Sequence, residues 1–244
     1  MEQAEKITTA GLLLQQYKKI RRHSETICRP LETEDYVVQP IVDVSPPKWH
    51  LGHTTWFFET FILMPNFKGY IEFNPQYNFV FNSYYETIGA RVVRTDRGNL
   101  SRPSVSDVYA YRAYVDEQME AFLQNTALSD KLVPILELGL NHEQQHQELL
   151  LTDIKYILGH NPLFPAYSDK EIFSKKSKEG SGFISMPEGI YEIGFNGTGF
   201  SFDNESNRHK KYLEAYEIAD SLVTNADYLK FIEDGGYVNF AHWH

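Results

Sequence analysis

The sequence predicts an α + (α+β) fold, in which a four-helix bundle is followed by a smaller unit of strands and helices. Before residue 165, apolar residues recur at helical spacing in four long segments. After that point the pattern changes to short β-like runs separated by glycine and proline. A helical first domain and a mixed second domain are therefore expected.

Composition limits the classes of function. The chain has 244 residues, enough for one large domain or for one domain and part of another. It is 42% hydrophobic and 14% aromatic, which is sufficient for a core and excludes a disordered protein. The net charge of −10 leaves no basic stripe to neutralise phosphates, so nucleic acid and anionic membranes are excluded as partners. Small molecules are the expected ligands.

Cysteine content and the N-terminal residues limit the metal chemistry and the compartment. Cys28 is the only cysteine, which excludes an internal disulfide framework and a cysteine-cluster metal site. Histidine and carboxylate ligands remain. The first residues lack the basic and apolar regions of a signal peptide, and no apolar run is long enough to cross a membrane. A cytoplasmic protein is expected.

The first two helices are predicted from periodicity and proline positions. Residues 7–28 have apolar positions at nearly helical spacing. Residues 30–47 contain several prolines and predict an irregular connection. Ser45-Pro46-Pro47 opens a second helix, and the dense apolar and aromatic residues from Lys48 to Leu63 predict that it is buried. Pro65 is expected to end it.

The third and fourth helices follow a long loop. Residues 65–104, rich in Asn, Tyr, Gly and Arg, are expected to form a functional loop. Ser104 or Ser106 is expected to cap a helix that runs to about Gln124. The fourth helix is predicted from about Asp130 to Leu158, with Gly159 and Pro162 as its stop signals. The predicted buried stripe of the third helix consists of Val108, Tyr111, Val115, Met119 and Phe122.

These patterns predict a domain at residues 1–167, a linker at 168–182 and an incomplete second domain at 183–244. The linker is polar and rich in lysine. Three β-like runs follow it, at residues 182–187, 189–194 and 200–205. Because only about 60 residues follow the linker, the second domain is expected to be incomplete.

A pair of histidines in the fourth helix predicts a metal site. His142 and His146 are four residues apart, so a helix places both imidazoles on one face. A third ligand must come from elsewhere in the chain. His53 is the best candidate, because it lies in an apolar and aromatic stretch where a buried histidine needs a partner.

Several alternatives to this interpretation remain. A histidine pair at this spacing also occurs on helices that bind no metal. Glu143 completes the string His-Glu-x-x-His, which is the signature of zinc metalloproteases, although no third-ligand extension follows it. Glu148 is expected to contact the ligands from the second coordination sphere or to contact substrate, and otherwise it is a surface carboxylate. His50 either competes as a ligand or fills space near the start of the second helix.

Several segments together resemble a known enzyme family. They are Ser45-Pro46-Pro47-Lys48-Trp49-His50-Leu51-Gly52-His53, Trp56-Phe57-Phe58-Glu59, His142-x-x-x-His146-x-Glu148, Phe202-Asp203-Asn204-Glu205, Val223-Thr224-Asn225 and Asp234-Gly235-Gly236-Tyr237. In order and spacing they resemble the sulfoxide synthases of ergothioneine biosynthesis. By this resemblance, residues 1–167 form a DinB-like four-helix bundle. Residues 183–244 form the start of a formylglycine-generating-enzyme-like domain of C-type-lectin type, in which Asp203, Asn204 and Glu205 hold a turn.

The resemblance implies a non-haem iron(II) enzyme that uses O₂ to join the sulfur of γ-glutamylcysteine or cysteine to the imidazole ring of hercynine, giving a sulfoxide. It implies that His53, His142 and His146 hold the iron. It also implies that Arg94 and Arg97 bind the carboxylates of the thiol substrate, a task for which guanidinium groups are suited. Three histidines alone would suit zinc equally well.

The resemblance also predicts what this chain lacks. The family's catalytic tyrosine and much of its hercynine pocket belong to a later part of the second domain, beyond residue 244. A truncated protein, or a split enzyme completed by a separate chain, would account for this. Two other functions remain open: a thiol transferase that binds zinc or nickel on the bundle, and a non-catalytic remnant. The sequence does not distinguish the thiol donor, or the ergothioneine pathway from those of ovothiol and selenoneine.

Overall fold

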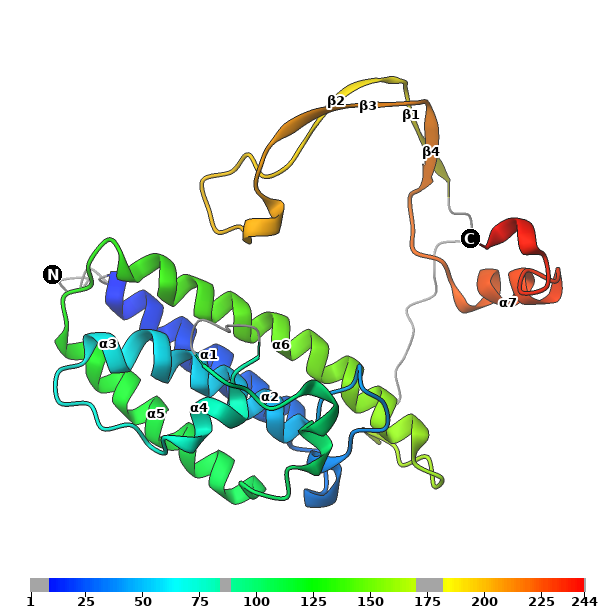
Figure 1. Cartoon of the computed structure of the whole chain (residues 1–244). Coiled ribbons are helices and arrows are strands. Elements are labelled where there is room, and N and C mark those ends of the chain that lie inside the picture. Colours follow the sequence, from blue (N-terminus) through cyan, green and yellow to red (C-terminus); the bar gives the residue numbers. More distant parts are fainter. Residues whose placement is uncertain (1–8, 84–88, 170–181, 244) are drawn as a thin grey trace, which may run out of the picture. The chain divides into compact units, whose positions relative to one another are not determined.

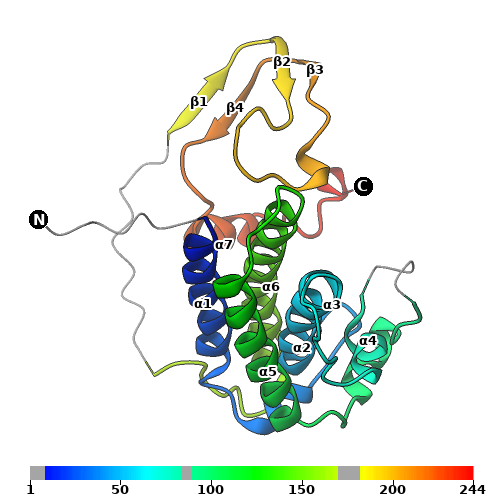
Figure 2. The ribbon, with the colours of Figure 1, turned by 90° about the vertical axis from the view of Figure 1, so that its left-hand side faces the viewer.

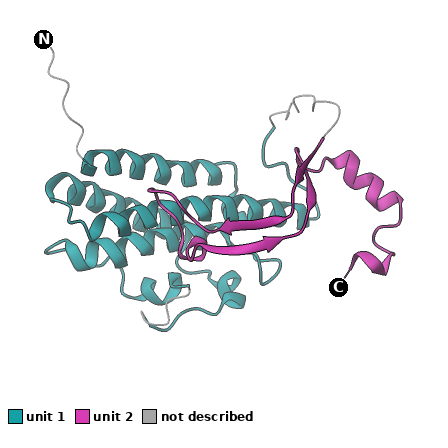
Figure 3. Cartoon of the chain, turned by 90° about the horizontal axis from the view of Figure 1, so that it is seen from above, with its two compact units in different colours: residues 1–170 teal, residues 171–244 magenta. Residues whose placement is uncertain are grey.

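The computed structural model describes residues 9–83, 89–169 and 182–243. The chain divides into two compact units, residues 1–170 and 171–244 (Figure 3). The first unit is helical, and the strands belong to the second. Among the described residues, none of the helices combines the length and apolar character needed to span a bilayer.

Four long helices form the first unit, as the sequence predicts. They are α1 (Thr9–Cys28), α2 (Pro47–Phe58), α5 (Val105–Asn125) and α6 (Leu132–His160). Helices α1 and α2 each contact both α5 and α6, so the four enclose a common core. Figures 1 and 2 show them lying lengthwise beside one another. Helix α6 ends two residues later than predicted, because Gly159 continues the helix and Asn161 is its C-cap.

The sequence predictions for α5 are confirmed. Ser104 is the N-cap: its hydroxyl accepts a hydrogen bond from the backbone N–H of Asp107, and the Asp107 carboxylate accepts one from the backbone N–H of Ser104. This reciprocal pair satisfies N–H groups that the first helical turn leaves unpaired. All five residues of the predicted stripe are fully buried.

Helix α2 begins where predicted, with Pro46 as N-cap and Pro47 as its first residue. It is buried along its whole length. A π-helical segment (η2, Glu59–Leu63) and then α3 (Met64–Asn66) continue it. The helical run ends at Asn66, one residue beyond Pro65, which was predicted to end it.

The segment predicted to be one long loop contains ordered structure. It includes α4 (Gln76–Phe81) and a 3₁₀ turn, η4 (Arg94–Asn99). Helix α4 forms because Asn74 accepts a hydrogen bond from the N–H of Gln76, and because Tyr77 and Phe81 bury one helical face. Residues 84–88 of the predicted loop lie outside the described residues.

Two glycines allow the helices around α2 to approach closely. A Cβ atom on Gly52 would lie 2.1 Å from the ring of Phe81 in α4. A Cβ atom on Gly139 of α6 would lie 2.8 Å from the rings of Phe57 and Phe58. Both distances are shorter than the contacts that packed side chains make. A larger residue at Gly52 would therefore displace Phe81 of α4, and one at Gly139 would displace Phe57 and Phe58 of α2.

The second unit contains two antiparallel strand pairs and a short helix. Strand β1 (Phe183–Met186) pairs with β4 (Tyr216–Ala219), and β2 (Gly189–Ile193) pairs with β3 (His209–Leu213). Helix α7 (Asn225–Glu233) is capped by Thr224. Two of the three β-like runs are confirmed as β1 and β2. The third is not a strand: Asp203, Asn204 and Glu205 form a 3₁₀ turn.

Within the described residues, the hydrophobic core is formed by side chains of the first unit. All core residues precede residue 160, whereas Phe183 and Ile190 are 66% and 69% exposed. Isolated two-stranded pairs are only marginally stable in water. The stability of the described structure therefore comes from the bundle. Most of the predicted linker, residues 170–181, lies outside the described residues.

This distribution of burial predicts how stability responds to truncation of side chains. Phe122→Ala removes a fully buried ring from the bundle and should lower the free energy of unfolding by about 3–5 kcal/mol. Ile190→Ala, at an exposed site of β2, should change it by less than about 0.5 kcal/mol. Urea titration followed by circular dichroism measures both. Equal losses would contradict this assignment of the core.

Candidate metal centre

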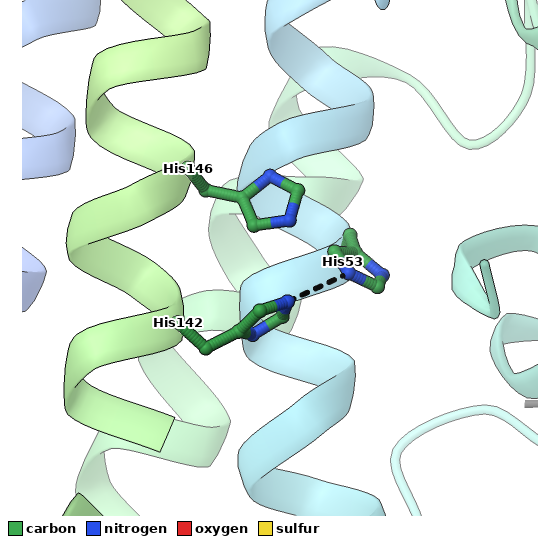
Figure 4. A group of neighbouring side chains, drawn as sticks. All are labelled: His53, His142 and His146. Atoms are coloured by element: carbon green, nitrogen blue, oxygen red, sulfur yellow. Dashed lines mark hydrogen bonds between the residues drawn. The ribbon is translucent and has the colours of Figure 1, made fainter. Parts of the chain in front are cut away.

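Three histidines from two helices meet inside the bundle. His53 comes from α2, and His142 and His146 come from α6. Each offers one ring nitrogen, and these atoms lie within 4.8 Å of one another. The Nε2 atoms of His53 and His142 are 3.2 Å apart. Figure 4 shows the three imidazole rings facing a common point. The structure thus brings together the three residues that the sequence nominated as ligands.

Helical periodicity explains how α6 presents two of them. His142 and His146 lie one turn apart and face α2. Glu143 and Gln147 lie on the adjacent stripe, where both bond to Ser24 of α1. One stripe of α6 thus carries the histidines, and the next is tied to another helix.

The orientation of His53 is set by its neighbours. Its Nδ1 lies 2.6 Å from the backbone oxygen of Phe81. Because a carbonyl oxygen only accepts, Nδ1 must carry the hydrogen, and the lone pair is on Nε2. The ring is stacked between Trp49 (centroids 4.6 Å apart, planes at 11°) and Trp56 (5.5 Å, 20°). The close approach at Gly52 brings the Phe81 carbonyl within reach of this ring.

His146 has a side-chain partner instead. Its Nδ1 lies 2.9 Å from Nδ1 of His50, whose Nε2 lies 2.9 Å from a carboxylate oxygen of Asp153. The same oxygen of Asp153 accepts a hydrogen bond from the backbone N–H of Ser45. His50 and Asp153 are both buried.

The third ring, that of His142, packs against Phe57, with centroids 5.1 Å apart. Within the described residues, its Nδ1 is buried without a hydrogen-bond partner. A buried polar atom without a partner is costly to the fold and is typical of functional sites.

Burial keeps all three imidazoles neutral. It lowers the pKa of His142 to about 4. Burial is also the main cause of the low pKa values of His53 and His146, and the neighbouring histidines lower both further. A neutral imidazole is the form that binds a metal ion. Three neutral imidazoles with nitrogens converging on one point fit a divalent metal ion, with coordination positions left for other ligands.

The metalloprotease alternative is wrong. Glu143 is fully buried and ion-paired with two arginines, at 3.0 Å from Arg21 and 2.6 Å from Arg112, and it accepts a hydrogen bond from Ser24. Burial by itself raises the pKa of Glu143, but the two guanidinium groups outweigh it and lower the pKa to about 2. A carboxylate with so low a pKa is a poor general base at neutral pH. Its role is to hold α1 and α5 against α6.

The two predicted substrate arginines occupy different environments. Arg97 is buried, donates hydrogen bonds to Ser45 and Ser83, and lies 3.4 Å above the ring of Trp49. After burial, its charge is a further cause of the low pKa values of His53 and His146. Arg94 is exposed and bonds to the backbone oxygen of Asp43. Substrate binding by either stays a prediction.

Of the two roles predicted for Glu148, the structure does not support contact with the ligands, and contact with substrate stays a prediction. Glu148 is exposed, two residues beyond His146 and therefore on a different helical face. The residue that bonds to His146 is His50, held by Asp153. The sequence left His50 as either a competing ligand or filler, and it assigned no role to Asp153. A usable signal was present, because Asp153 lies seven residues, or two turns, beyond His146.

The low pKa values predict how acid affects the metal-free protein. In the unfolded chain a histidine takes up a proton near pH 6.5, whereas folded His142 does so only at about 4. The unfolded state therefore binds more protons between these values, so the free energy of unfolding should fall as pH decreases from 6.5 to 4. His142→Phe should make this fall shallower by up to about 1.4 kcal/mol per pH unit. An unchanged slope would contradict a buried, neutral His142.

The ion pairs of Glu143 predict a structural role that can be separated from metal binding. Glu143→Gln leaves two buried guanidinium groups without this anion and should lower the free energy of unfolding by on the order of 3 kcal/mol. Glu148→Gln, at an exposed site of the same helix, is the matched control and should change it little. The folded Glu143→Gln protein should keep its metal stoichiometry. Loss of metal without loss of stability would contradict this assignment.

Comparison with known proteins agrees with the helical fold. Hercynine oxygenase from Mycolicibacterium smegmatis is 27% identical over 207 residues, covering 82% of this chain and 45% of that protein. This chain thus spans less than half the length of that relative. Residues 16–150, more than half of the chain and including all three histidines, match the family model of the DinB superfamily. The chain therefore belongs to the DinB superfamily.

Proposed function

We propose that this chain is the iron-binding part of an O₂-dependent sulfoxide synthase. The reaction would form a carbon–sulfur bond between a cysteine-containing thiol, γ-glutamylcysteine or cysteine, and hercynine, in ergothioneine biosynthesis. The observation that carries the proposal is the cluster of three neutral histidines, in a chain related to a protein named hercynine oxygenase.

The proposed reaction balances without a further reductant. The thiol loses one hydrogen, the imidazole ring of hercynine loses another, and O₂ provides the sulfoxide oxygen and the oxygen of one water molecule. The two substrates together supply all four electrons that reduce O₂. When bound, iron(II) would supply the site at which O₂ and the thiol sulfur react.

The residues of this chain would prepare such a site in two ways. His53 and His146 each direct a ring nitrogen at the cluster and use the other in a hydrogen bond. Trp49, Trp56 and Phe57 cover the rings and limit the access of water. Arg97 is the better candidate for the substrate carboxylate, because its guanidinium lies over Trp49, which is stacked on His53.

Residues outside this chain would supply the rest of the active site. We propose that the second unit, whose described part contains only two strand pairs and a short helix, is the start of a formylglycine-generating-enzyme-like domain. The relative named hercynine oxygenase is more than twice as long as the matched region. Further polypeptide, including a separate chain, would contribute the catalytic tyrosine and much of the hercynine pocket.

A zinc-dependent or nickel-dependent thiol transferase is the second candidate. The donor set favours it as much as it favours iron, because three neutral imidazoles also bind zinc tightly. The family match covers the bundle alone, which a transferase of this kind would require. A non-catalytic metal-binding protein would need the same site. Metal preference and O₂ consumption distinguish the three.

Anaerobic metal binding is the first test. The intact chain should bind about one iron(II), and His53→Ala, His142→Ala and His146→Ala should each lose it while remaining folded by circular dichroism. His160→Ala is the control, because His160 lies on the same helix but is exposed. Iron should bind in preference to zinc when both are supplied in cells. Metal that is indifferent to the three histidines would overturn the proposal.

The reaction itself is tested with the iron-loaded protein, O₂, hercynine and each thiol in turn. Consumption of O₂ that requires both substrates, with a sulfoxide product detected by mass spectrometry, would support the synthase. Where the chain alone gives no product, thiol binding at iron is measured from the electron paramagnetic resonance of the iron–nitric oxide complex. A spectrum that no thiol changes would contradict the synthase.

A further inference from the structure

A second layer of polar residues lies behind the histidine cluster. Asp153 of α6 contacts His50 of α2, which contacts His146 of α6, and both contacts measure 2.9 Å. The layer thus links α6 to α2 and back to α6. The exposed fractions of His50 and Asp153 are only 4% and 7%, so water competes little for these bonds.

The hydrogen positions along this chain follow from donor and acceptor chemistry. The Asp153 oxygen only accepts, so Nε2 of His50 carries a hydrogen. His50 is buried and makes these two contacts, and a neutral ring with its hydrogen on Nε2 has a lone pair on Nδ1. The bond to His146 then requires that Nδ1 of His146 carries the hydrogen. Nε2 of His146 is left with its lone pair directed at the cluster.

We propose that His50 and Asp153 are a positioning pair that holds His146 in its metal-binding tautomer. The Asp153 carboxylate accepts a hydrogen bond from His50, and His50 in turn accepts one from His146. Such partners orient a ligand and strengthen it as a donor. The inference rests on the proposed metal site, and it adds two residues that lie outside the three-histidine set.

The geometry assigns His50 this role and not that of a fourth ligand. Both of its ring nitrogens are already engaged, one by Asp153 and one by His146. Asp153 is itself fixed, since its carboxylate also accepts a hydrogen bond from the backbone N–H of Ser45, just before α2. The start of α2 therefore sets the position of the whole pair.

The three proposed ligands differ in how their second nitrogen is held. His53 donates to a backbone carbonyl, which no side-chain substitution at Phe81 removes. Nδ1 of His142 is without a hydrogen-bond partner in the described part of the chain. His146 is thus the ligand whose tautomer depends on side chains, and substitutions at its partners are the ones that test the idea.

Two substitutions at His50 separate positioning from packing. His50→Leu removes both bonds. His50→Gln keeps both, because the amide oxygen accepts from His146 and the amide nitrogen donates to Asp153. Affinity for cobalt(II), used as a spectroscopic substitute for iron(II), is measured by titration of its visible absorption. His50→Leu should weaken binding by about 10–100-fold and alter the spectrum, whereas His50→Gln should stay within about 5-fold of the parent.

The outcomes are distinct. If His50→Leu binds cobalt(II) as the parent does, or if His50→Gln loses as much affinity as His50→Leu, the positioning role is overturned while the metal site stands. If the parent binds no metal, the proposed function falls and the positioning role falls with it. Asp153→Ala in the folded protein gives a second reading, and it should weaken binding by about 10-fold. Unchanged affinity there would also overturn the pair.

Discussion

The structure depends on holding three imidazoles together in the neutral form, one of them buried and two half-buried. The bundle removes most water from His53, His142 and His146 and lowers the pKa of each. The cost of this burial is offset where a ring nitrogen finds a partner, such as the Phe81 carbonyl or His50. One further nitrogen of each ring faces the cluster, and the Nε2 atoms of His53 and His142 lie 3.2 Å apart. In the folded protein a divalent cation is the partner that would satisfy these three nitrogens at once.

The neighbouring stripe of α6 carries a buried side chain that is charged, not neutral. Glu143 there is surrounded by Arg21, Arg112 and Ser24, so that one buried anion ties α1 and α5 to the helix that carries two of the histidines. Breaking such a buried network is costly because it leaves charges without partners. The same turn of α6 thus directs neutral imidazoles toward α2 and the Glu143 carboxylate toward α1 and α5. The ion pairs of Glu143 therefore fix the rotation of α6 that makes its histidines face α2.

Much of this arrangement could be predicted from the sequence, because it depends on periodicity. The stripe of α5, the cap at Ser104 and the pair His142 and His146 all follow from helical spacing. The spacing of His146 and Asp153 places both on one face of α6, but that His50 lies between them could not be predicted, because His50 is about 100 residues from both and is brought near only by packing. Helix α4 was missed for a similar reason: its two buried aromatic residues, Tyr77 and Phe81, gain stability from contacts with the bundle, which a short window does not reveal.

The proposed chemistry requires that one metal ion is held by three imidazoles from α2 and α6. X-ray absorption spectroscopy of the iron(II)-loaded chain can count these ligands, because imidazole rings give a characteristic outer-shell scattering. Three rings at iron are expected in the parent protein, and two in any single His→Ala variant that still retains iron. A count of one imidazole ring at iron would contradict this site. A spectrum that His53→Ala leaves unchanged would show that α2 provides no ligand.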